Sequence, residues 1–183
     1  DSHKRAYNIW LNQFAVSLEE FGHELGVDYD LKCKPTVENI REDGRKLLEN
    51  LPKDYGGAAL LEFLAVLTMH VNPKVVVETG VGLGYSSRLF LVCFDDLEKS
   101  ILFSSELPYP GIDNSEAISG SLVPQNLRKN WYFLKDGDQR NLVAFRDQLS
   151  GKVIDLVHYD SDKTMSGRRR FFRSIQKYLK VGT

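Results

Sequence analysis

The sequence predicts an α/β protein, in which a doubly wound, mostly parallel sheet carries helices on both faces and follows an N-terminal helical segment. Two observations favour this class. From Lys74 onward, short apolar runs alternate with segments of helical periodicity, which is typical of a parallel sheet with helical crossovers. The first apolar run contains three consecutive valines and leads into a glycine-rich turn, as expected for a strand buried on both faces.

The length and charge of the chain limit its partners. With 183 residues, of which 42% are hydrophobic, it can bury one core. Its 24 basic and 25 acidic residues leave a formal net charge of -1, so no overall field attracts polyanions or anionic membranes. We therefore expect a small-molecule substrate as partner, and neither a nucleic acid nor a membrane.

Cysteine use and hydropathy favour a cytoplasmic protein. Cys33 and Cys93 lie far apart, and neither has the neighbours of a metal cluster. The first residues, DSHKRAYNIW, lack the apolar block of a secretory signal, and no apolar run approaches the ~18 residues of a membrane span.

The N-terminal segment, residues 1–57, is expected to be helical. Apolar residues recur at spacings of three and four between Lys4 and Leu25, which is typical of an amphipathic helix. They are Tyr7, Trp10, Phe14, Leu18, Phe21 and Leu25. A face this broad needs a partner, and three remain open: the body of the same chain, a second copy in a homodimer, or a substrate cleft that the helix covers.

Two further helices are expected before the sheet. Gly26 to Pro35 has the composition of a turn, and Val37 to Leu51 then has helical periodicity, weakened by Gly44. A third helix is predicted from Gly57 to Val71, because one side of it would carry Leu60, Leu61, Leu64, Leu67 and Thr68. Asn72-Pro73 ends it.

The second half of the chain predicts four strands and the helices that connect them. The strands are expected at Lys74–Thr79, Ser100–Leu107, Trp131–Lys135 and Val153–Asp160. The helices are expected at Tyr85–Phe94, Asn141–Leu149 and Gly167–Leu179. The connection Pro108–Gln125 is rich in Pro, Gly and Ser, and holds at most one short helix at Ser115–Ile118. Because Leu179–Thr183 has the composition of a turn into another strand, we expect that C-terminal strands are missing from this chain.

Acidic residues lie at or just after the end of each predicted strand. Glu78 ends the first strand, Glu106 the second and Asp160 the fourth, while Asp136 and Asp138 follow the third. A single acid at such a place is often a helix cap or a solvated turn residue. Since ligands of parallel sheets bind at the carboxyl ends of the strands, the series predicts a binding site there.

The glycine-rich turn predicts a cofactor cradle, because Gly80, Gly82 and Gly84 let the backbone approach a ligand closely. Glu78 would repel a pyrophosphate but can pair with a cationic ligand such as a sulfonium nucleotide. The dinucleotide fingerprint needs Gly-x-Gly-x-x-Gly, and here Tyr85 stands in place of its last glycine. A sulfonium cofactor is therefore favoured, with an NAD(P)-dependent oxidoreductase as the alternative.

The order of elements and these motifs resemble a class I S-adenosylmethionine-dependent methyltransferase with a Rossmann-like fold. The resemblance covers about Ala58 to Gly182 and is strongest in ALLEFLAVLTMHVNPKVVVETGVGLGYSS, which is similar to small-molecule O-methyltransferases. It implies that residues 58–183 form the cofactor-binding domain of an enzyme that methylates an oxygen of a small molecule. A non-catalytic cofactor-binding or assembly module, which acts through its N-terminal helix, is a further alternative.

The same resemblance implies which residues hold S-adenosylmethionine. They are Glu78, Thr79, Gly80, Gly82, Gly84, Tyr85, Ser86, Glu106, Gly137, Asp138 and Asp160. Among these, the turn from Glu78 to Gly84 cradles the methionine part and Glu106 accepts hydrogen bonds from the ribose hydroxyls. Gly137 and Asp138, in KDGDQRNL, border the adenine. The chemistry agrees, because a carboxylate is a good acceptor for a diol.

A second motif, IDLVHYDSDKTMSG, resembles the fourth-strand motif of metal-dependent O-methyltransferases of the catechol and caffeoyl-CoA type. That resemblance implies that Asp160 binds a divalent cation, Mg or Ca, and that Lys163 is the general base. Such a cation would lower the pKa of a substrate hydroxyl. The remaining metal ligands of that family follow a strand that this chain does not contain. The motif is also similar to a broader methyltransferase group, and Asp160 and Asp162 could simply cap the next helix.

Two further features have an ordinary and a functional interpretation. His158 is expected on the same face of its strand as Asp160. It is either a base or metal ligand, or an ordinary, partly buried side chain. A group of arginines, interleaved with Phe171 and Phe172, is either a solvated helix face or a contact for an anionic substrate group. These are Arg168, Arg169, Arg170 and Arg173.

Overall fold

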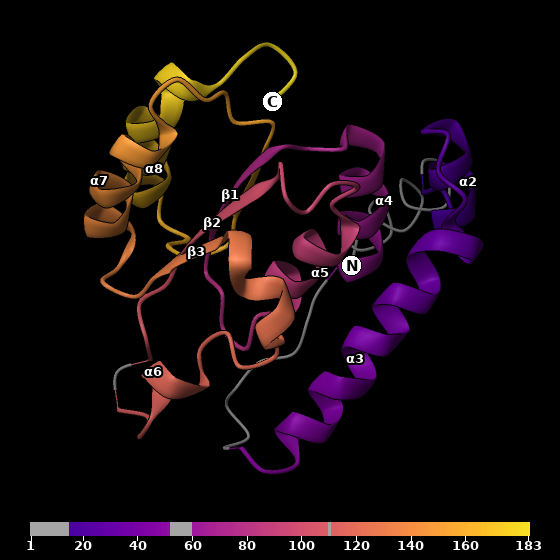
Figure 1. Ribbon diagram of the computed structural model, residues 1–183, viewed down its shortest axis with the longest axis horizontal. Helices are drawn as coiled ribbons and strands as arrows, with labels where there is room; N and C mark the ends of the chain where they lie inside the picture. The colour runs from indigo at the N-terminus through magenta and orange to yellow at the C-terminus, as the bar shows by residue number, and fades with distance from the viewer. Residues whose placement is uncertain (1–14, 52–59, 110) are drawn as a thin grey trace, which may run out of the picture.

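A computed structural model describes residues 15–51, 60–109 and 111–183, and it confirms the α/β fold class (Figure 1). Four parallel strands form one sheet in the order β3-β2-β1-β4. Their bounds are β1 Val75–Thr79, β2 Ile101–Ser105, β3 Trp131–Leu134 and β4 Leu156–Tyr159. The predicted boundary between residues 57 and 58 lies outside the described residues.

The central strand β1 is buried along its whole length, as its valines predict. Its side chains alternate between two cores. Val75 and Val77 pack with Phe103 and the helices on one face, while Val76 packs with Phe90 on the other. Thr79, the last residue of β1, pairs with the last residues of β2 and β4, which are Ser105 and Tyr159. The residues that follow these three strands therefore meet along one edge of the sheet.

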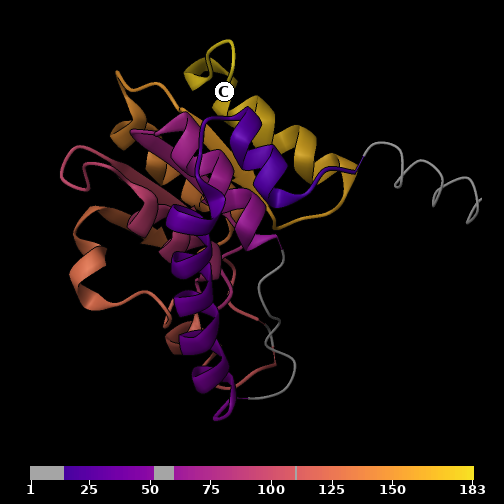
Figure 2. The same ribbon diagram turned by 90° about the vertical axis from the view of Figure 1, so that its right-hand side faces the viewer.

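Helices cover both faces of the sheet. Figure 1 shows α7 and α8 on one side, and α3, α4 and α5 on the other. Figure 2 views the molecule from the side of α3, which lies in front of the sheet. The helices of the first side are α7 Asp138–Leu149 and α8 Met165–Ile175, and those of the second are α3 Lys34–Leu48, α4 Leu61–Val71 and α5 Tyr85–Cys93. Shorter elements are α2 Leu18–Glu24, η1 Tyr29–Cys33, α6 Ser115–Ile118, η2 Gln125–Asn130 and η3 Gln176–Tyr178. None of the described helices is long and apolar enough to cross a bilayer.

The predicted helix from Lys4 to Leu25 is confirmed at Leu18–Glu24 and is wrong at residues 15–17, which have no regular structure. Helix α2 begins at Leu18, after a capping box in which Ser17 accepts from the backbone N–H of Glu20 and the Glu20 side chain accepts from that of Ser17. Phe21 stacks on Phe63 of α4 with ring centroids 5.2 Å apart, so this part of the aromatic face packs on its own chain. The rest of the stripe, Tyr7, Trp10 and Phe14, lies outside the described residues.

Several other helix boundaries differ from the prediction. Gly26–Pro35 is not a simple turn, because it holds η1 and the start of α3. Gly44 does not interrupt α3; it lets the helix lie against the Tyr85 ring, which a Cβ at this position would overlap. Helix α7 begins three residues before Asn141, and Thr164 rather than an aspartate caps α8 by accepting from Gly167 N at 3.0 Å.

The end of the chain lies beside β4. Ile154 and Leu179 form a single parallel bridge, and Ile154 N donates to the Tyr178 carbonyl at 2.8 Å. Helix α8 ends at Ile175 rather than at Leu179, since η3 takes over the last turn.

Candidate functional site

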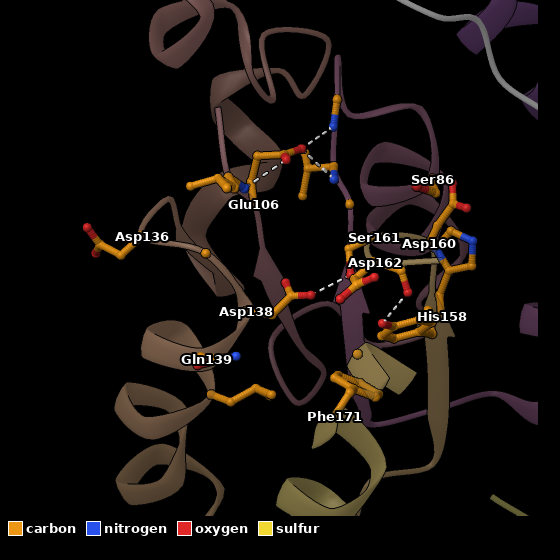
Figure 3. A pocket seen from close by; sticks show the side chains of 18 of the residues that line it. Ser86, Glu106, Asp136, Asp138, Gln139, His158, Asp160, Ser161, Asp162 and Phe171 are labelled. Carbon is orange, nitrogen blue, oxygen red and sulfur yellow. Dashed lines mark hydrogen bonds between the residues drawn. The ribbon is translucent and has the colours of Figure 1, made fainter. Parts of the chain in front are cut away.

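A cavity of about 1070 Å³ lies at the carboxyl edge of the sheet, where the ends of β1, β2 and β4 meet the first turns of α5 and α7 and the inner face of α8 (Figure 3). Most of the predicted site residues line it: Gly80, Gly82, Tyr85, Ser86, Glu106, Gly137, Asp138 and Asp160. Four predicted residues do not line it: Glu78, Thr79, Gly84 and Lys163.

The glycine-rich turn runs close to the end of β4. Gly80 has a φ of +78°, and a Cβ on it would lie 2.5 Å from the carbonyl oxygen of Asp160. Its N–H donates to the Ser105 carbonyl at 2.9 Å, which ties the turn to β2. Gly82 also has a positive φ, +53°, but no heavy atom lies within 4 Å of its Cβ position. The turn therefore needs glycine at Gly80 for space, and it is open at Gly82.

Glu106 connects this turn to the end of β2. Its Oε2 accepts from Val81 N at 2.7 Å and Gly82 N at 2.5 Å, and its Oε1 accepts from Leu107 N at 2.8 Å (Figure 3). Burial raises the pKa of this carboxyl above its usual value of 4.5; the three N–H groups oppose that shift, and the charge of Glu78 adds to it. Glu106 thus lies at the cavity wall as an acceptor of hydrogen bonds.

Glu78 is fully buried and is held from inside the protein. Its carboxylate accepts from the hydroxyls of Ser86 and Ser87 at 2.5 Å each, and from that of Ser104 at 2.7 Å. The expectation that this carboxylate pairs directly with a cationic ligand does not agree with this geometry, because three serines occupy it and it does not line the cavity. Of its three serine partners, only Ser86 lines the cavity.

Asp138 joins the ends of three strands. Its Oδ1 accepts from the Ser105 hydroxyl at 2.7 Å and its Oδ2 from the Ser161 hydroxyl, which lies 3.0 Å from Thr79 Oγ1. Sequence reasoning missed Asn141, a buried residue of α7 whose amide donates to Ser105 Oγ at 2.9 Å. The only sequence signal was its place in KDGDQRNL, just after the acids.

Asp160 and Lys163 form an ion pair at the mouth of the cavity. Their side chains are 58% and 62% exposed, so the pair is solvated rather than enclosed. Asp162 accepts from Thr164 N at 2.8 Å, and hydrogen bonding by Thr164, aided by the charges of Arg170 and Arg168, lowers its pKa. Within the described residues, no group of three or more His, Cys, Asp or Glu side chains could hold a metal ion.

His158 lies on β4 and lines the cavity. Its ring packs edge-on against Phe90, with centroids 5.7 Å apart, and its Nδ1 lies 3.6 Å from Glu78 Oε1. That nitrogen is buried and has no hydrogen-bond partner among the described residues.

No protein family and no curated protein matches the sequence. Among solved structures, the O-methyltransferase from Bacillus cereus in complex with SAH has a similar fold, with a TM-score of 0.60, 17% identity and coverage of 80% of this chain and 62% of that chain. The SAH-bound methyltransferase PaMTH1 from Podospora anserina has a TM-score of 0.58 at 17% identity, over 78% of this chain and 58% of that one.

A third structure, the O-methyltransferase TomG from Streptomyces achromogenes in complex with SAM, has a TM-score of 0.56 at 16% identity, over 79% and 60% of the two chains. This chain therefore spans about three fifths of the length of these proteins. At such identities the likeness shows the fold: the sheet and helices are arranged as in O-methyltransferases that bind SAM or SAH.

Proposed function

We propose that this chain binds S-adenosylmethionine and transfers its methyl group to an oxygen of a small-molecule acceptor. The observation that carries the proposal is that Glu106 and the turn from Gly80 to Gly82 share one wall of a cavity at the carboxyl edge of the sheet. A fold shared with SAM- and SAH-bound O-methyltransferases supports it.

The residues of the cavity fit the proposed cofactor. Gly82 leaves open space where a Cβ would stand, so a ligand can approach the backbone. Glu106 offers carboxylate oxygens to a ribose diol, and we assign the adenine to the region of Gly137 and Asp138. The volume of about 1070 Å³ leaves space for an acceptor beside a nucleoside.

S-adenosylmethionine, when bound, supplies a methyl group on a positively charged sulfur. The chain would position the acceptor oxygen and remove its proton. We assign these roles to Asp160, which lines the cavity, and to Lys163, which is paired with Asp160. The described residues do not fit Mg or Ca, because they offer no group of three metal ligands and Asp160 is paired with Lys163.

The cofactor assignment is tested by calorimetric titration of the chain with S-adenosylhomocysteine. We expect saturable binding that Glu106→Gln weakens at least about 10-fold, since the substitution removes a charged acceptor. Glu98→Gln is the matched control, because Glu98 is 80% exposed and pairs only with Lys129 among the described residues. Failure to bind, or equal binding by Glu106→Gln, would contradict the assignment. NADH is titrated in parallel, and binding of NADH alone would favour the oxidoreductase.

A homodimer through the aromatic N-terminal stripe and a cytoplasmic location stay predictions. The first is tested by sedimentation of the whole chain against a variant that lacks residues 1–14. A monomer in both cases would contradict the homodimer.

A further inference from the structure

We propose that the cavity contains an anion-binding subsite between α7 and α8, formed by Arg140, Arg170 and Arg173, which takes a carboxylate or phosphate group of the acceptor. The subsite follows from the described side chains. Its assignment to the acceptor, rather than to another ligand, rests on the proposed function.

One face of α8 turns toward the cavity. Gly167, Arg170, Phe171 and Ser174 follow one another at helical spacings of three, one and three residues, and all line the cavity, as Arg173 does. By contrast, Arg168 and Arg169, on the same helix, do not line it. The arginine cluster is therefore divided into cations that face the cavity and cations that do not.

Helix α7 forms the opposite side of this part of the cavity. Its third residue, Arg140, and its neighbours Gln139 and Leu142 line the space. Gln139 and Phe171 mark the two helices in Figure 3. Leu142 and Phe171 line the cavity and belong to the apolar core, so this part of the wall offers an apolar surface to the carbon skeleton of an organic acid.

The charges of the cavity are compensated unevenly. Five carboxylates line the cavity. Glu106 accepts from three N–H groups, Asp138 accepts from two hydroxyls, Asp160 pairs with Lys163 and Asp162 lies near Arg170, whereas Asp136 has no ion-pair partner among the described residues. Within the described residues, Arg140 and Arg173 have no carboxylate at ion-pair distance, and that of Arg170, on Asp162, is 3.9 Å away. Arg140 and Arg173 therefore line the cavity without a counter-ion among the described residues.

The arginines of α8 lie close to the N-terminus of their helix. A helix N-terminus carries partial positive charge and favours acidic residues in its first turn. Helix α8 has none there, and instead places three arginines directly after that turn. Asp162, which precedes the helix and lies 3.9 Å from Arg170, offsets part of this repulsion. A ligand anion would offset more of it, because guanidinium groups bind carboxylates and phosphates in a bidentate manner.

The test is calorimetric titration of the whole chain with inorganic phosphate and, separately, with benzoate, at constant ionic strength. We expect binding that Arg170→Gln/Arg173→Gln weakens at least about 10-fold. The matched control, Arg168→Gln/Arg169→Gln, removes the same charge from the same helix outside the cavity, and we expect it to weaken binding less than about 2-fold. Equal weakening by both variants, or no binding of either anion, would overturn the subsite. Should the first variant not fold, Arg173→Gln against Arg169→Gln makes the same comparison.

The probe that binds more tightly identifies the anionic group of the acceptor. Tighter binding of phosphate indicates a phosphorylated acceptor, and tighter binding of benzoate indicates a carboxylated one. Both titrations are repeated with saturating S-adenosylhomocysteine. Unchanged anion affinity supports the assignment to the acceptor, whereas loss of anion binding would overturn it. If S-adenosylhomocysteine does not bind but arginine-dependent anion binding remains, the proposed function fails and the subsite stands.

Discussion

Nδ1 of His158 lies 3.6 Å from Oε1 of Glu78, and the two residues are register partners on β4 and β1. The same Glu78 carboxylate accepts from Ser104 on β2, whose hydroxyl accepts from Trp131 Nε1 on β3 at 2.8 Å. One row of polar side chains therefore crosses all four strands and ends at the cavity, which His158 lines. The central acid of the row has a structural task, because three buried serines depend on it.

We expect Glu78→Ala to lower the free energy of unfolding by about 3 kcal/mol, because it leaves three serine hydroxyls without their acceptor. Urea denaturation measures the change. Glu98→Ala, at an exposed position, should change stability by less than about 0.5 kcal/mol. A loss below about 1 kcal/mol for Glu78→Ala would show that the serines find other partners.

The place of Glu78 could be predicted from the sequence, but its partners could not. Three valines before it mark a buried strand, which is a local property of the chain. Its partners come from β2 and α5, so they depend on strand register and on helix packing. Glu78 was expected to face the ligand because a strand end is at the ligand edge; the alternation of side chains instead turns it toward α5.

Local interactions also set helix boundaries that the apolar periodicity does not show. The apolar spacing runs through Ser17 without a break, yet the capping box with Glu20 starts a helix there. The arginines of α8 show the same limit for the site. Sequence placed them on one helix, but only the packing of that helix decides that Arg170 and Arg173 line the cavity while Arg168 does not.

Glu106 predicts a pH dependence of stability. Burial raises its pKa above 4.5 in the folded chain, so between the unfolded and folded pKa values the folded chain binds more protons. The stability that this group contributes is therefore fully present below the unfolded pKa and is lost as the pH rises through the folded pKa. We expect the free energy of unfolding to fall relative to Glu106→Gln as the pH rises from about 4 to about 7.

Urea denaturation of both proteins at several pH values across this range measures the difference in the free energy of unfolding. The contributions of ionisable groups that both proteins contain cancel in this difference. Glu98→Gln serves as the control, because Glu98 is 80% exposed. A difference that stays constant, or that grows in favour of the unsubstituted chain, would contradict the raised pKa of Glu106.

Gly80→Ala and Gly26→Ala form a matched pair. Both glycines have a positive φ, +78° and +71°, but a Cβ meets the Asp160 carbonyl at 2.5 Å only at Gly80, and at Gly26 nothing lies within 4 Å. We expect Gly26→Ala to cost about 1 kcal/mol of stability, through backbone strain, and Gly80→Ala about 3 kcal/mol. Thermal or urea unfolding measures both, and equal costs would show that the turn can move away from β4.

We expect substitution of Lys163 to affect the rate of methyl transfer rather than cofactor binding. It does not line the cavity, but it is paired with Asp160, which does. We expect Lys163→Ala to lower the rate about 100-fold, with the affinity for S-adenosylhomocysteine unchanged, because the substitution removes the amine that, in its neutral form, is the proposed proton acceptor. Transfer of labelled methyl groups to dihydroxybenzoate measures the rate, since this acceptor carries both a hydroxyl and an anionic group.

Lys99→Ala is the control for Lys163→Ala. Lys99 forms the same kind of pair, with an aspartate three residues before it, and is 79% exposed. We expect it to change the rate less than about 2-fold. Should Lys163→Ala keep the rate while His158→Ala loses it, the proton acceptor is the imidazole. That outcome would place the chemistry at the end of the polar row, because His158 lines the cavity and lies beside the Glu78 carboxylate.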